Sequence, residues 1–199
     1  MKKTLFYLIV IIIVVVAGGI FSLTAYRSLY VSPDAELSAP PPGLPVVLSS
    51  TSTMPATLEI PSLSVNAKVQ YVGIAKGGAM GIPTNFTDVA WYKYGPVPGA
   101  IGNAVIDGHL DNAVSLPGVF KHLADVKTGD DIYVTNVSGT KLHFKVTGTE
   151  LRKYNDTATA DIFGPSNKAN LILITCEGTW NQSIKEYSDR FIVFSTLVQ

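Results

Sequence analysis

Cys176 is the single cysteine of this chain and the first candidate for a chemical role. It follows the apolar run Leu171–Ile174 and Thr175, which together predict a buried strand, and a polar turn begins at Glu177. A lone thiol in such a place is either a small core residue or a nucleophile. A cysteine nucleophile needs a proton-transfer partner and a group that stabilises the developing oxyanion.

Three histidines are available as that partner. His143 alternates with apolar neighbours in a predicted strand, and His122 falls in a short predicted helical segment, so both are interpreted as surface residues. His109 differs because it follows the predicted strand Asn103–Gly108 and therefore lies at a strand end, where loops begin. Taken alone, His109 is either a hydrogen-bonded turn residue or the proton-transfer partner of Cys176.

Arg190 opens the last predicted strand, after a polar turn. Such an arginine is either a surface charge or a permanent cation suited to an acyl oxyanion and a thiolate. The order His109, Cys176, Arg190 is not the papain-like order, in which the cysteine precedes the histidine.

No metal or cofactor is predicted. One cysteine and one candidate histidine, without CxxC or HxxxH spacing, do not make a zinc site. The acids that could attract calcium are scattered through a polar segment and are interpreted as solvated: Glu150, Asp156 and Asp161.

The elements that must position these residues are short strands separated by glycine and proline. They are predicted at residues 57–60, 65–74, 89–92, 103–108, 132–134, 141–146, 171–176 and 190–194. About eight strands at this spacing are typical of an all-β barrel or sandwich. Residues 119–126 predict a helical turn or two, and the long polar stretch 152–170 predicts a functional or mobile loop.

The N-terminal segment from Leu5 to Ala25 carries no charge and is long enough to span a bilayer as a helix. Lys2 and Lys3 precede it, which keeps the N-terminus in the cytoplasm. The alternative is a cleaved signal peptide, but the apolar run exceeds the usual ~7–15 residues of one. We therefore expect a single-pass signal anchor in the cell membrane, with the remainder extracytoplasmic.

Three regions follow from this pattern: a cytoplasmic tip and transmembrane anchor at 1–31, a Pro/Ser/Thr-rich linker at 32–55, and a folded domain at 56–199. The linker is too rich in proline and too poor in apolar residues to fold alone. With 15 basic and 15 acidic residues, the chain shows no basic surface for nucleic acid. An exported domain that keeps one unpaired thiol makes a chemical use of Cys176 more plausible.

The segments around the three candidates resemble the sortase family. Leu173–Cys176 resembles the sortase Leu-x-Thr-Cys signature, Gly108-His109 resembles the histidine segment, and Arg190–Phe194 resembles the final strand with its arginine. Weaker similarities to sortases of classes E and F, such as Trp91-Tyr92 and Pro98-Gly99, extend over the whole folded domain. Class F sequences often carry the arginine where this chain has Ser188, whereas the class A placement matches Arg190.

This resemblance implies an eight-stranded sortase β-barrel in which Cys176 is the nucleophile, His109 the general acid and base, and Arg190 the oxyanion-stabilising group. Thr175 matches a threonine that contacts substrate. The implied reaction cleaves an LPXTG-like sorting motif between threonine and glycine through a thioester. The acyl group passes to an amine acceptor, either a peptidoglycan precursor or a protein, so the implied partners are sorting-signal-bearing surface proteins and that acceptor.

Two other functions remain open. L,D-transpeptidases place a histidine close before the cysteine, whereas Thr175 precedes Cys176 here. A catalytically inactive sortase-like binding module is the alternative from another class, and the intact set of His109, Cys176 and Arg190 argues against it.

Overall fold

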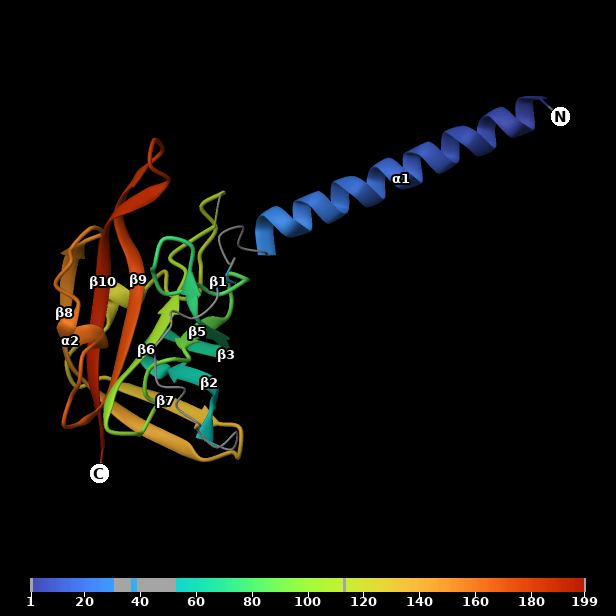
Figure 1. The fold of residues 1–199 in the computed structure, drawn as a ribbon. Coiled ribbons are helices and arrows are strands. Elements are labelled where there is room, and N and C mark those ends of the chain that lie inside the picture. The colour runs from blue at the N-terminus through green and yellow to red at the C-terminus, as the bar shows by residue number, and fades with distance from the viewer. Residues whose placement is uncertain (1, 31–36, 39–52, 113, 199) are drawn as a thin grey trace.

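The computed structural model describes residues 2–30, 37–38, 53–112 and 114–198. In chain order its helices and strands are α1 (Lys2–Tyr30), β1 (Leu37–Ser38), β2 (Pro55–Ile60), β3 (Val65–Val72), β4 (Ile74–Ala75), β5 (Val89–Tyr92), β6 (Gly102–Gly108), β7 (Asp131–Asn136), β8 (Lys141–Lys153), α2 (Ala160–Phe163), β9 (Ala169–Asn181) and β10 (Glu186–Leu197). Eight strands close into a barrel in the order β10-β8-β7-β2-β3-β5-β6-β9 (Figure 1). The predicted eight-stranded all-β barrel is therefore confirmed.

The β7–β8 hairpin shows how alternation in the sequence builds the barrel wall. Ile132 lies opposite Phe144, and Val134 lies opposite Leu142. Ile132, Val134 and Phe144 are fully buried in the barrel interior, because successive side chains of a strand point to opposite faces. The hairpin predicted for this part of the chain is confirmed.

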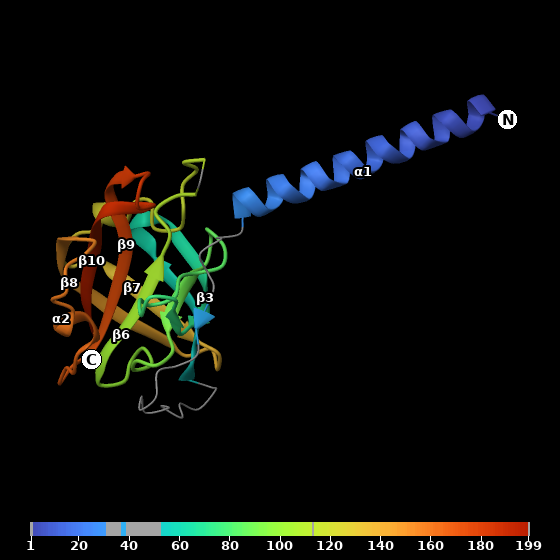
Figure 2. The ribbon, with the colours of Figure 1, turned by 45° about the horizontal axis from the view of Figure 1, so that its top comes forward.

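Strands β6 and β9 are buried on both faces, which explains their unbroken apolar runs. Ala104 and Ile106 of β6 face the barrel interior. Val105 faces outward, where it joins a second apolar cluster with Ile172 of β9 and Ile162 of α2. Both views of the molecule show β9 lying between β6 and β10 (Figure 2).

Two segments differ from their predicted structure. The predicted helical stretch 119–126 contains a single short 3-10 helix, Leu123–Asp125, preceded by turns. The predicted loop 152–170 begins with the last residues of β8 and contains α2. A helix of four residues is too short to produce a helical periodicity in the sequence, and the last part of β8 is largely exposed and polar.

Helix α1 covers the segment expected to form the membrane anchor. Within the described residues, however, no helix combines the length and the apolar character needed to cross a membrane. The expected linker, residues 32–55, lies mostly outside the described residues, and β2 already begins at Pro55.

Candidate active site

Cys176 and Arg190 are direct neighbours across two antiparallel strands. They are paired residues in the register of β9 and β10. Side chains of directly opposed residues lie on the same face with Cβ atoms about 5 Å apart. The thiol and the guanidinium, which are 14 positions apart in sequence, are therefore brought together by the pairing of these two strands.

His109 is brought to the same place by the parallel pairing of β6 with β9. The last paired residues of that ladder are Asp107 and Ile174. Cys176 lies two positions further along β9, and His109 lies two positions after Asp107, directly past the end of β6 at Gly108. By strand alternation both positions fall on the face shared by Asp107 and Ile174. The structure thus gathers His109, Cys176 and Arg190 at one end of the outer face of three adjacent strands.

A buried hydrogen bond joins the ends of β6 and β9 beneath these residues. Thr175 Oγ1 donates to the carbonyl oxygen of Gly108 at 2.8 Å, and Thr175 is fully buried. A Cβ atom on Gly108 would lie 2.5 Å from the ring of Phe120, so this position requires glycine. Thr175 points away from the face of Cys176; its predicted contact with substrate stays a prediction.

The imidazole of His109 is oriented by its neighbours. Its Nε2 lies 3.0 Å from the carbonyl oxygen of Pro83, and its ring centroid lies 4.7 Å from that of Phe86. A carbonyl oxygen only accepts hydrogen bonds, so Nε2 carries the proton. In the neutral ring, Nδ1 is then the nitrogen that can take up a proton and release it.

The guanidinium of Arg190 is held from within its own strand. It donates to Glu186 Oε2 at 2.6 Å and to the carbonyl oxygens of Asp189 and Tyr187 at 3.1 and 3.4 Å. These bonds occupy some of its five N–H groups and restrict its orientation, so Arg190 is a fixed cation next to its strand partner Cys176.

Burial dominates the electrostatics of the thiol. It raises the pKa of Cys176 to about 12, and the positive charge of Arg190 opposes that rise. The negative charges of Asp107, Glu186 and Asp111 raise the pKa further. At neutral pH the reactive thiolate is therefore a small fraction of the molecules.

Two acids near the site were not among the predicted residues. Burial raises the pKa of Asp107 to about 7, and the nearby Arg190 opposes this shift. Asp111 accepts a hydrogen bond of 2.7 Å from the hydroxyl of Tyr187 on β10, which ties the loop after His109 to that strand. The sequence does contain one indication for Asp107: it lies two residues before His109, and side chains two residues apart on a strand point to the same face.

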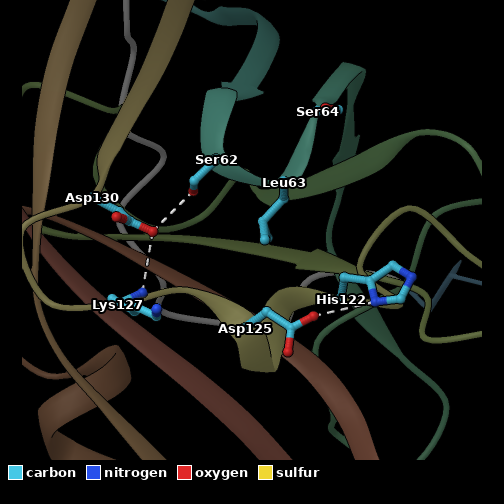
Figure 3. A pocket seen from close by; sticks show the side chains of 7 residues that line it. All are labelled: Ser62, Leu63, Ser64, His122, Asp125, Lys127 and Asp130. Atoms are coloured by element: carbon cyan, nitrogen blue, oxygen red, sulfur yellow. Dashed lines mark hydrogen bonds and ion pairs between the residues drawn. The ribbon is translucent and has the colours of Figure 1, made fainter.

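The other two histidines lie elsewhere. His143 points outward from β8, with Nε2 2.7 Å from Asp131 Oδ1. His122 lines a polar surface pocket of about 430 Å³ and lies 3.3 Å from Asp125 (Figure 3). In the same pocket, Asp130 accepts hydrogen bonds from Ser62 and from the backbone of Lys127. The pocket contains none of the predicted catalytic residues.

Two of the three acids considered for calcium, Glu150 and Asp161, are arranged around an arginine, whereas Asp156 accepts a hydrogen bond from the backbone N–H of Ala158. Arg152 binds Glu150 at 2.7 Å and also binds Asp161. Their charges are therefore matched by a guanidinium instead of facing a shared cavity. In the described ranges, no three His, Cys, Asp or Glu side chains gather as a metal site.

Comparison with known proteins identifies the family of this chain and its fold. Residues 58–198 match the family described as Sortase domain. Sortase A from Corynebacterium diphtheriae is similar with a TM-score of 0.55 and 25% identity, over 73% of this chain and 61% of that chain. A lid mutant of the same Corynebacterium diphtheriae protein is similar with a TM-score of 0.56 and 26% identity, over 73% of this chain and 70% of that chain. A Clostridium perfringens sortase D5 transpeptidase shares the fold at 18% identity, with a TM-score of 0.55 over 73% and 79%. No curated protein matches.

Proposed function

Since this chain belongs to the sortase family, we propose that it is a cysteine transpeptidase that cuts sorting peptides and transfers the acyl part to an amine. The observation that supports this most strongly is the register of three strands. Cys176 lies opposite Arg190, and His109 occupies the matching position at the end of β6. A nucleophile, a proton carrier and a cation therefore share one face.

In the first half of the reaction, the thiolate of Cys176 attacks the carbonyl carbon of the threonine. A carbon–sulfur bond forms, and the carbonyl electron pair moves to the oxygen, where Arg190 stabilises the negative charge. The carbon–nitrogen bond then breaks. Protonated His109 gives its proton to the departing glycine nitrogen, and a thioester remains on Cys176.

In the second half, an acceptor amine attacks the thioester carbonyl. The amine loses a proton to His109, the carbon–sulfur bond breaks, and Cys176 leaves as a thiolate. The histidine thus acts as an acid in one half and as a base in the other. Because the reactive state needs a thiolate together with an imidazolium, a bell-shaped dependence of rate on pH is expected.

The substrates we propose are surface proteins with an LPXTG-like motif cut between threonine and glycine. The acceptor is an amine of a peptidoglycan precursor or of another protein. We further propose that Leu5–Ala25 holds the enzyme in the cell membrane with its barrel outside. Support for that anchor comes from the uncharged sequence and from Lys2 and Lys3 before it.

The test is to incubate the full chain with a Leu-Pro-Ala-Thr-Gly peptide, with and without triglycine, and to follow products and protein mass. We expect a mass increase on Cys176, cleavage between threonine and glycine, and a transfer product when triglycine is present. Cys176→Ala abolishes the adduct. Cleavage by that variant would contradict the mechanism, and a wild-type chain that binds the peptide without reacting would favour an inactive binding module.

Matched histidine variants give the control. His109→Gln removes the proton carrier and lowers kcat/KM by about 10²-fold or more. His122→Gln changes the same residue type at an exposed position in the polar pocket of Figure 3 and leaves the rate unchanged. Equal losses from the two variants would exclude the assigned role of His109.

A further inference from the structure

The outer face of β6, β9 and β10 continues beyond the catalytic residues as two mostly apolar rows. Asp107, Ile174 and Ile192 form the row next to Cys176, and Val105, Ile172 and Phe194 form the row after it. Among these six residues, Asp107 is the only charged one. Its partner on β5, Ala90, is fully buried, so the acid has apolar residues on both sides along its row.

The carboxylate of Asp107 interacts with the charge of Arg190, but it has no hydrogen-bonded partner among the described residues. It accepts no hydrogen bond from any residue that the structure describes, yet it is partly buried. An ionised carboxylate in such a place is unfavourable unless a donor reaches it. Burial raises the pKa of Asp107 to about 7, so above neutral pH the group is a negative charge on this face that the nearby Arg190 offsets only in part.

The spacing of the rows indicates what would meet this charge. Neighbouring rows on one face are two residues apart, about 6.8 Å, which is also the length of two residues of an extended peptide. In a sorting peptide whose threonine carbonyl lies at Cys176, the preceding residue or two lie over the row of Asp107. Further from the threonine the peptide approaches α2, because Ile162 of that helix already covers Val105 and Ile172 of the row beyond.

We propose that Asp107 is a specificity-determining residue, which favours sorting peptides with a cationic side chain at the position directly before the threonine. This inference rests on the proposed function and deepens it. An acid in the same position repels a glutamate there and attracts a lysine or an arginine. The variable position of the motif is then read by charge in this sortase.

The test compares full-chain enzyme on three peptides, Leu-Pro-Lys-Thr-Gly, Leu-Pro-Ala-Thr-Gly and Leu-Pro-Glu-Thr-Gly, without added amine, so that selection of the acceptor does not enter. At pH 8 we expect kcat/KM for the lysine peptide to exceed that for the glutamate peptide by about tenfold, a typical effect of a partly desolvated charge pair. Asp107→Asn brings this ratio close to one, and Asp107→Lys inverts it. Asp125→Asn removes an acid from the distant pocket and keeps the wild-type ratio.

The pH dependence of this kcat/KM ratio provides a second readout, which a purely structural role of Asp107 would not give. Several ionisable groups lie on the same face and its borders. They are Tyr92 on β5, His109 and Asp111 after β6, Cys176 on β9, Arg190 and its partner Glu186 on β10 and, on α2, Asp161 bound by Arg152. An imidazole ordinarily titrates in the same pH range as Asp107. The ratio of kcat/KM for the lysine and glutamate peptides is therefore compared between wild type and Asp107→Asn, so that effects common to both enzymes cancel. We expect the difference between the two enzymes to shrink below about pH 7, as Asp107 becomes neutral.

The two proposals fail in different ways. If no peptide is cleaved, the proposed function falls and this inference with it. If the alanine peptide is cleaved but the wild type shows no charge preference, or if Asp107→Asn keeps the preference, the inference alone is overturned.

Discussion

At the scale of single residues, burial acts against the charged forms of both Cys176 and Asp107. The guanidinium of Arg190 opposes the shift in each case, because it favours the anionic form of any neighbour. Their two negative charges also repel each other, so ionisation of Asp107 makes the thiolate harder to form. The permanent charge of Arg190 therefore favours the anionic forms of both groups, while Glu186 and Asp111 add further negative charge that disfavours the thiolate.

This balance predicts how the thiol responds to pH. Because the pKa of Cys176 is raised to about 12, the rate of alkylation by iodoacetamide should rise about tenfold per pH unit from pH 7 to pH 10, without levelling off. Arg190→Gln removes the charge that lowers this pKa and slows alkylation severalfold at pH 9. A rate that levels off below pH 8 would show that burial does not control the thiol. An unfolded peptide containing cysteine is the control, since its rate levels off above about pH 8.5.

Asp107 also predicts a dependence of stability on pH. A carboxyl whose folded pKa is raised from 3.8 to about 7 stabilises the fold at low pH, and this contribution is lost as the pH rises between these values. Asp107→Asn should therefore increase the free energy of unfolding by up to about 4 kcal/mol at pH 8 and hardly at all near pH 4. Urea unfolding at both pH values measures the difference. Asp125→Asn, at an exposed position, should show no such change, and an equal gain at both pH values would refute the explanation.

At the scale of elements, β9 and β10 carry two of the proposed catalytic residues, and the third directly follows β6. The strands themselves were predictable: Asn103–Gly108 appears as β6, and the apolar run before Cys176 lies within β9. Arg190, however, is not the start of its strand, since β10 begins at Glu186. The added residues are mostly polar, and they form strand because the partner strand β9 is also extended to Asn181.

Asp107 escaped prediction for a different physical reason. In the sequence it is one acid within an apolar strand, and its proximity to Cys176 arises only from the pairing of β6 with a strand far away in the chain. The register between two distant strands cannot be read from either strand alone. Helix α2 escaped because its apolar anchor, Ile162, packs on residues from three strands that the sequence does not place beside it.

The position of helix α2 against the barrel depends on the buried side-chain amide of Asn103. Asn103 Nδ2 donates to the carbonyl oxygens of Asp161 and Gly164 at 2.9 and 3.3 Å, and its Oδ1 accepts from Asn170 at 2.9 Å. Asn103→Ala should lower the free energy of unfolding by ~1–3 kcal/mol, since it leaves these groups unsatisfied. Limited proteolysis between residues 154 and 168 should become faster.

The matched control for this change is Asn66→Ala on β3, where the side chain is exposed. We expect unchanged stability and an unchanged cleavage pattern from this variant. If Asn103→Ala behaved in the same way, α2 would be held by its apolar contacts alone.

At the scale of the whole molecule, the barrel contains the stabilising core. Every buried apolar residue of the described chain lies between Leu58 and Val193. A fragment from Met54 to Val198 keeps β2 in its place between β3 and β7 and should unfold within about 3 °C of the full chain. Thermal unfolding followed by circular dichroism tests this.

A shorter fragment that starts at Val65 provides the contrast. It lacks β2, so β3 and β7 each lose a partner and the barrel opens. Exposed strand edges promote association between chains, and we expect this fragment to aggregate. A stable monomer from the shorter fragment would contradict the role of β2 in closing the barrel.

The connection between β6 and β9 sets the order in which the site can assemble during folding. The residues joined by the Thr175–Gly108 hydrogen bond are 67 positions apart, whereas β9 and β10 are joined by a short turn. Contacts between distant segments form late, because closing a long loop costs more conformational entropy than closing a short one. Cys176 therefore meets Arg190 before it meets His109. Until β6 pairs with β9, the thiol lies beside a cation without His109, so the proposed acyl transfer requires that this long-range strand pair has formed.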